Sequence, residues 1–299
     1  MLSKTYKRSL SPSTLVSASL AGVLLLASTN AAAYCRTTTE PGPGGDCSST
    51  GIPVFWRNAC VGMRLSTAAE PGVGEALAAQ KIQEALAAWG ALSCKPSLTG
   101  MYLGTTTDGT AGYVKGNAAN QNIIVFRNTS WPYEDRNQVA LTTLTFRKDI
   151  GEILDADIEV NGTLKLVATD PVPPSGFDLP TVLAHEIGHV FGLAHSSVQG
   201  ATMFAKYTTG TTEQRTLKSD DEEGLCSVYP SDQTRNTAGG GIVATACDPE
   251  AQPDPGGNGG GCGCKVGERG SDGSSTMATV ALASAAALYL GRRRKRGRA

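Results

Sequence analysis

HEIGHVFGLAH, residues 185–195, contains every histidine of this 299-residue chain. The three, His185, His189 and His195, follow the spacing H-E-x-x-H-x-x-G-x-x-H, in which a zinc site carries its own base. A bare H-E-x-x-H arises often by chance. The third histidine at the right offset, the glycine between and the lack of any other histidine argue against coincidence. The stretch therefore predicts a metal site.

The residues before the motif predict an α-helix from about Leu179 to Phe191. Asp178 is a good N-cap, and Pro180 is tolerated in the first helical turn. Residues four apart lie on one helical face, so the first two histidines can bind one ion. Gly192 is the natural end of the helix, because glycine accepts the left-handed conformation there. The chain can then turn back so that His195 reaches the same ion.

Three imidazoles leave a fourth zinc position for water, which is the catalytic arrangement rather than the structural one. Glu186 neighbours a ligand on the helix, so its carboxylate can face that water. Zinc lowers the pKa of bound water toward ~7, and Glu186 can take the proton and pass it to a leaving amine. These parts predict an amide hydrolase. A structural or inactive metal site is the alternative, and Glu186 argues against it.

Three segments resemble the metzincin metallopeptidases and, within them, the matrixins. They are HEIGHVFGLAHS, ATMFAKY and LKSDDEEGLCSVYP. The resemblance places Met203 in the family's Met-turn under the metal, and Tyr207 matches the tyrosine that follows it. Met203 taken alone would be an ordinary core residue, but its position eight residues after His195 favours the Met-turn. The resemblance covers about Cys60 to Tyr229.

The expected fold is α+β: a metzincin or zincin-like catalytic domain with a twisted five-stranded mixed sheet, long helices and an irregular C-terminal subdomain. Apolar patterning predicts the amphipathic helix Glu75 to Ala91, with Ile82, Leu86 and Trp89 on one face. Strands are expected at Cys60 to Thr67, Met101 to Thr105, Asn122 to Arg127, Val139 to Phe146 and Ile153 to Val160.

By the same resemblance, Val139 to Phe146 is an antiparallel edge strand above the cleft. Its free backbone groups would pair with an extended peptide or protein substrate, the mode called β-augmentation.

Alternate positions Asp155, Asp157 and Glu159 make one face of a strand acidic. Calcium prefers such oxygen ligands, so a structural Ca²⁺ site is one interpretation. Carboxylates that accept hydrogen bonds and fix loops are the other. Catalytic Zn²⁺ is the expected cofactor. Matrixins commonly hold a second zinc through histidines, and this chain has none left for it.

Both ends of the chain predict sorting elements. Residues 1–33 have the basic start, apolar stretch and Ala31-Ala32-Ala33 site of a secretory signal peptide. A matrixin-like domain is expected at 34–230 and a Gly/Pro-rich linker at 231–261. Residues 262–299, with Cys262–Cys264, the apolar run Met277 to Leu290 and a basic tail, resemble the MYXO-CTERM type of sorting tag.

That resemblance implies export and retention in the cell envelope, through the membrane and a sorting machinery. Processing near Cys262–Cys264 would then leave the protein at the outer surface or release it. The apolar run is shorter than the ~20 residues of a comfortable transmembrane span. A weak tether that is never cut is the alternative.

The charge distribution excludes a nucleic-acid partner. Nine of the 26 lysines and arginines lie in the first eight and last eight residues, so the part between carries 17 cations against 27 acids. Such an acidic exported domain has no electrostatic footprint for nucleic acid.

Eight cysteines suit an oxidising compartment. Without the last two, six remain and allow fifteen pairings. The sequence alone does not choose among them. A bridge between Cys60 and Cys94 and another between Cys226 and Cys247 are two hypotheses. No prodomain cysteine motif of the kind that keeps animal matrixins latent is present. Cys35 could act as a latch, although a disulfide is the stronger hypothesis.

Together these features predict an exported zinc endopeptidase in which Glu186 is general base and acid, the three histidines bind the metal, and Met203, Gly192 and Tyr207 support the site. A zinc hydrolase of another amide is one alternative. A surface protein with an inactive metzincin domain is another.

Overall fold

The computed structural model describes residues 34–115, 117, 119–237, 240–251 and 277–286. The predicted signal peptide, residues 1–33, lies outside these ranges, as does most of the predicted tag. The main helices are α1 (Glu75–Gly90), α2 (Leu179–Val190) and α3 (Ser219–Val228). Short 3-10 turns are η1 (Pro43–Gly45) and η2 (Glu213–Arg215).

The main sheet has seven strands in the order β10-β13-β5-β6-β4-β2-β3. Their bounds are β2 (Cys60–Ser66), β3 (Thr99–Thr106), β4 (Ile123–Phe126), β5 (Gln138–Arg147), β6 (Ile153–Val160), β10 (Lys206–Tyr207) and β13 (Met277–Ala286). Strands β2, β3, β4 and β6 run parallel, and β5 is antiparallel to β6. The α+β class with a mixed sheet is confirmed, and all five predicted strands are present.

Two expectations about this sheet are wrong. The sheet has seven strands rather than five, because β10 and β13 extend it past β5. For the same reason β5 is not an edge strand, since β13 pairs with it antiparallel from Met277↔Arg147 to Ala285↔Gln138. The apolar run that supplies β13 has the composition of a membrane segment, so its pattern did not predict a strand of the sheet.

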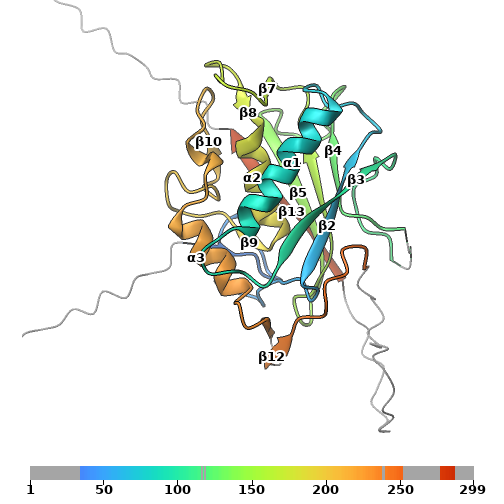
Figure 1. Cartoon of the computed structure of the whole chain (residues 1–299), viewed down its shortest axis with the longest axis vertical. Helices are drawn as coiled ribbons and strands as arrows, with labels where there is room; N and C mark the ends of the chain where they lie inside the picture. Colours follow the sequence, from blue (N-terminus) through green and yellow to red (C-terminus); the bar gives the residue numbers. More distant parts are fainter. Residues whose placement is uncertain (1–33, 116, 118, 238–239, 252–276, 287–299) are drawn as a thin grey trace, which may run out of the picture. The chain divides into compact units, whose positions relative to one another are not determined.

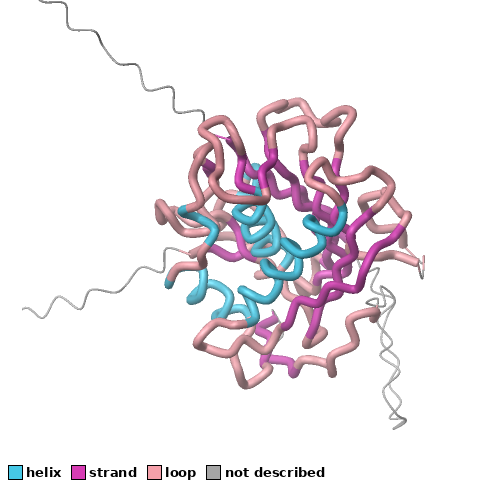
Figure 2. Tube along the Cα trace, turned by 45° about the horizontal axis from the view of Figure 1, so that its top comes forward, coloured by secondary structure: helices cyan, strands magenta, loops and turns pink. Residues whose placement is uncertain are grey.

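Helices α1 and α2 lie together against the sheet (Figures 1 and 2). The predicted apolar face of α1 is buried at Ile82, Leu86 and Trp89. Trp89 Nε1 donates to the carbonyl oxygen of Ala184 in α2 at 2.9 Å. This contact fixes the metal-site helix against the other long helix.

Smaller strand pairs complete the fold. Strand β1 pairs with β9, β7 with β8, and β11 with β12. Their bounds are β1 (Cys35–Arg36), β7 (Leu166–Val167), β8 (Phe177–Asp178), β9 (Leu193–Ala194), β11 (Thr234–Thr237) and β12 (Gly240–Val243).

The disulfides join Cys35 to Cys47, Cys60 to Cys247 and Cys94 to Cys226. Both hypothesised pairings are therefore wrong, because the chain after α3 returns to the start of β2, and α3 itself packs beside the end of α1. Cys35 is in a disulfide, as the stronger hypothesis stated.

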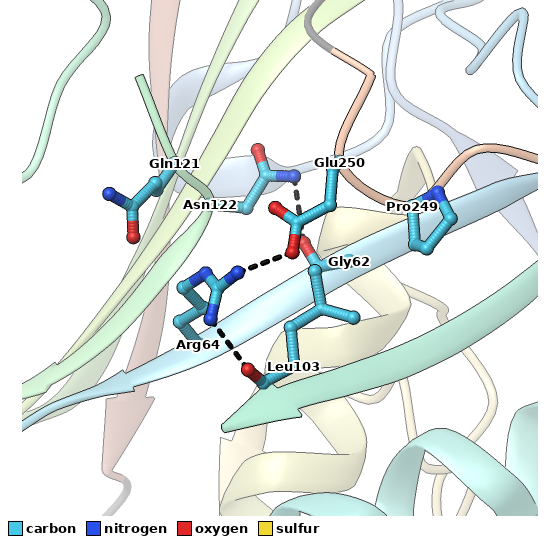
Figure 3. Close-up of a pocket in the computed structure, with 7 residues that line it drawn as sticks. All are labelled: Gly62, Arg64, Leu103, Gln121, Asn122, Pro249 and Glu250. Carbon is cyan, nitrogen blue, oxygen red and sulfur yellow. Dashed lines mark hydrogen bonds and ion pairs between the residues drawn. The ribbon is translucent and has the colours of Figure 1, made fainter. Parts of the chain in front are cut away.

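Residues 244–251, expected to be linker, lie along β2 as a strap. Thr245 N donates to the Arg57 carbonyl at 3.0 Å, and Cys247 is bonded to Cys60. At the end of the strap, Arg64 pairs with Glu250 and also donates to the carbonyl oxygen of Leu103 (Figure 3). The strap thus holds the chain after α3 against β2, the neighbour of the edge strand β3.

Within the described residues, no helix combines the length and apolarity needed to cross a membrane.

Candidate metal centre

Helix α2 presents two of the three histidines. Its N-cap is Asp178, whose Oδ2 accepts from Thr181 N at 3.0 Å, and Pro180 lies in its first turn. Gly192 has φ +87°, and the chain reverses there as predicted. A β-carbon at this position would be strained.

His195 reaches the same place from the other side of the reversal. Its backbone N donates to the carbonyl oxygen of Gly45, in η1, at 2.8 Å. The disulfide from Cys35 to Cys47 closes the loop that contains η1. The N-terminal segment is therefore part of the frame of the site.

The three imidazoles converge. Potential ligand atoms of His185, His189 and His195 all lie within 4.8 Å of one another, and the side chains are buried. Among the described residues, the other cluster able to hold a metal is Cys94, Glu222 and Cys226. Its two cysteines form a disulfide, so the histidine cluster is the candidate metal centre.

Hydrogen bonds fix which ring nitrogens can bind a metal. His185 Nδ1 lies 2.6 Å from the carbonyl oxygen of Thr202, and His189 Nδ1 lies 2.8 Å from that of Leu193. Carbonyl oxygens only accept, so we assign the protons to Nδ1. The Nε2 atoms, 3.0 Å apart, then direct lone pairs at each other.

The donor set fits a zinc ion. Two nitrogens of one tetrahedral zinc site lie roughly 3.3 Å apart, as Zn–N bonds of 2.0–2.1 Å require. The 3.0 Å separation is close to that value. His195 Nε2 is buried and has no hydrogen-bond partner. A cation bound between the three imidazoles would remove the repulsion between the facing lone pairs. It would also give the buried His195 Nε2 a partner.

Burial keeps the imidazoles neutral. It lowers the pKa of His185 to about 3 and that of His189 well below its usual range. Burial also lowers the pKa of His195, although nearby Asp46 opposes this. Neutral imidazole is the form that binds metal, so no proton has to be displaced near neutral pH.

Glu186 is buried between the helix and β5. Its Oε2 accepts a hydrogen bond from Thr142 Oγ1 at 2.6 Å. Sequence reasoning missed Thr142, because a threonine within VALTTLTF has no signal that separates it from its neighbours Thr143 and Thr145. The bond holds the carboxylate beside the histidine cluster.

Met203 forms the floor under α2. A β-carbon at Gly188 would lie 2.2 Å from Met203 Sδ and 2.8 Å from Trp89 Cζ2. Met203 therefore packs against α2 at the position where Gly188 has no side chain. The ring of Tyr207 lies edge-on to that of His185, with centroids 5.3 Å apart. The structure thus places Tyr207 against an imidazole of the cluster and Met203 against the helix that carries two of the histidines.

Two aspartates of α3 hold the turn that carries Met203. Asp221 accepts from the backbone N of Thr202 and of Met203, each at 2.9 Å. Asp220 accepts from Ser196 Oγ at 2.6 Å. Each of these bonds joins residues 18 to 24 positions apart, and the sequence alone did not predict them.

Two of the three carboxylates on the acidic face of β6 accept hydrogen bonds from donors of the chain, whereas Asp155 Oδ2 is buried without a hydrogen-bond partner among the described residues. Asp157 accepts from the backbone N of Ile123 at 2.9 Å and of Gly112 at 2.6 Å. Glu159 accepts from Arg127 and Tyr133. These contacts are those of carboxylates that fix loops, while the calcium site stays a prediction.

Comparison with known proteins supports the same centre. Residues 106–230 match the matrixin model of peptidase family M10. Matrix metalloproteinase-27 of Tupaia belangeri is 39% identical over 77 residues, which are 25% of this chain and 15% of that protein. Neutrophil collagenase of Homo sapiens is 36% identical over 75 residues, 25% of this chain and 16% of that protein.

A plant metalloendoproteinase is also similar to this chain. Metalloendoproteinase 2-MMP of Arabidopsis thaliana is 42% identical over 59 residues, 20% of this chain and 15% of its own length. The chain spans about a sixth of the length of these curated relatives. The family match includes β5, α2, the Met203 turn and α3. The mixed sheet and three helices are consistent with a metzincin catalytic domain.

Proposed function

We propose that the chain is a zinc-dependent endopeptidase. The observation that carries the proposal is the convergence of three buried imidazoles beside a buried glutamate. The matrixin match to residues 106–230 supports the same conclusion.

His185, His189 and His195 would hold the ion through Nε2. When bound, zinc supplies a Lewis acid that acidifies a water molecule and polarises a carbonyl group. Glu186 accepts the proton of the attacking water and delivers it to the amine that leaves. Thr142 orients the Glu186 carboxylate, and Met203 and Tyr207 keep the imidazoles in place.

We further propose that the protein is exported and kept in the cell envelope. The support is the sequence alone: a signal-peptide pattern in residues 1–33 and a tag resembling the MYXO-CTERM type in residues 262–299. Sorting machinery and the membrane would be partners until the tag is processed. A pulse-chase experiment in the native host should show loss of both ends. Cytoplasmic retention of the uncut chain would contradict this.

The endopeptidase proposal is tested on the full chain. A recognition sequence for a site-specific protease is introduced within residues 252–276, so that the C-terminal part can be cut off. The chain is assayed intact, and again after cutting and gel filtration, with casein and a fluorogenic peptide library. We expect one zinc per chain, and cleavage that chelation abolishes and zinc restores. Glu186→Gln should remove cleavage without removing zinc, whereas Glu213→Gln at an exposed site should change neither.

Two results would contradict the proposal. Full cleavage by Glu186→Gln would remove the assigned base. Stoichiometric zinc with no cleavage of any peptide, before or after cutting, would instead favour an inactive metzincin domain or another amide substrate.

A further inference from the structure

Strand β13 lies in a slot between β5 and β10 (red in Figure 1). It is antiparallel to β5 over nearly its full length. It is also parallel to β10, with Lys206↔Ala285 and Tyr207↔Ala286. The last described segment of the chain is thus bound by backbone pairing on both sides.

The register places β13 beside the histidine cluster. Leu282 is paired with Thr142, the residue that donates to Glu186. A β-carbon at Gly45 would lie 3.2 Å from His195 Cε1 and 3.5 Å from Leu282 Cβ. Leu282 and His195 therefore lie on the same side of η1.

Side-chain exposure agrees with that register. Leu282 is fully buried, whereas its neighbour Ala281 is exposed. Successive residues of a strand point to opposite faces, so Leu282 faces the protein interior and Ala281 faces away. Of these two neighbouring residues, Leu282 is the one whose side chain is buried.

A strand edge has one row of backbone donors and acceptors, and one added strand uses it up. While β13 is paired with β5, no other extended peptide can pair there. A substrate that binds by β-augmentation must displace β13 first.

We propose that β13 is an intramolecular occupant of the peptide-binding slot, which keeps the full chain latent until its C-terminal tag is removed. This rests on the proposed endopeptidase function. The occupant is covalently joined to the strap that ends at Ala251, so dilution does not lower its effective concentration.

The test compares the full chain with Leu282→Lys and with the matched control Ala281→Lys. The lysine at 282 brings a charge to a buried position, whereas the lysine at 281 stays in solvent. Hydrogen exchange of the amides of residues 138–147 is measured in each chain, with the amides of α2 as the control for folding. Hydrolysis of a fluorogenic peptide is measured on intact chains and on chains cut within residues 252–276.

We expect Leu282→Lys to speed exchange in β5. We also expect it to raise peptide hydrolysis by the intact chain at least about tenfold, because it shifts the population toward the state in which β13 is not paired with β5. Cutting and removing the tag should do the same for the unsubstituted chain. Ala281→Lys should resemble the unsubstituted chain in both readouts.

Equal exchange in β5 for all three chains, with α2 protected, would overturn the proposal. So would equal hydrolysis by intact and cut chains. Faster exchange in Leu282→Lys, with no hydrolysis by any chain, would overturn the endopeptidase function and support the occupancy of the slot.

Discussion

At the scale of single residues, hydrogen bonds fix the orientation of two imidazoles and of the Glu186 carboxylate. Carbonyl oxygens of Thr202 and Leu193 hold two imidazoles at Nδ1. Thr142 holds the carboxylate of Glu186. A group held in this way cannot turn its reactive atom away from the cluster, so each partner has a measurable role in positioning.

Thr142→Val should lower kcat of the cut chain about tenfold or more, since a hydrogen bond to a charged group contributes about 1.5–3 kcal/mol. KM and zinc content should stay unchanged, because the backbone of β5 and the histidines are untouched. Thr143→Val, one residue along the strand, is the control. A rise in KM at constant kcat would assign Thr142 to substrate binding instead.

Gly188→Ala should destabilise the fold by about 1–3 kcal/mol, because the new methyl group overlaps Met203 Sδ and Trp89. Gly90→Ala meets no atom within 4 Å and is the matched control in the other long helix. Thermal unfolding measures both. An unchanged Tm for Gly188→Ala would mean that Met203 is not fixed against α2.

At the scale of elements, β6 contains two buried carboxyl groups that interact. Burial raises the pKa of Asp155 and of Asp157 from the ordinary value of 3.8. The folded state therefore keeps protons that the unfolded state has lost. Stability should fall as the pH rises above about 4, where the unfolded state binds fewer protons than the folded state.

Asp155→Asn should flatten this decline and raise the free energy of unfolding at pH 8, because folding no longer requires proton uptake at this position. Urea unfolding between pH 5 and 9 measures it, with the exposed Asp135→Asn as control. Stability that instead rises with pH, and rises further with added Ca²⁺, would favour the calcium interpretation of this strand.

The sequence predicted the elements whose signal is local. Helix α2 followed from Asp178, Pro180 and Gly192, and the strands followed from apolar runs. Contacts between distant segments had no such signal. The pairing of Cys60 with Cys247 depends on where the chain goes after α3, and β13 depends on a free strand edge. Thr142 belongs to the same class, since its partner is 44 residues away.

At the scale of the whole molecule, the proposed zinc ion would couple the site to global stability. The three histidines are buried, and an ion that binds only the folded state stabilises it by about 2.7 kcal/mol at a hundred times its Kd. Chelation should therefore lower the Tm of the full chain, and zinc should restore it. His189→Gln should abolish this response in calorimetry. A Tm indifferent to zinc would contradict the assigned ligands.

The bond between Cys60 and Cys247 closes a covalent ring of the chain that includes α1, α2 and α3. A single nick at any peptide bond inside that ring leaves the two fragments joined through sulfur. A first cut by self-digestion in this segment would then not separate the two fragments until the bridge is reduced. Electrophoresis of aged samples with and without reductant would display such hidden breaks.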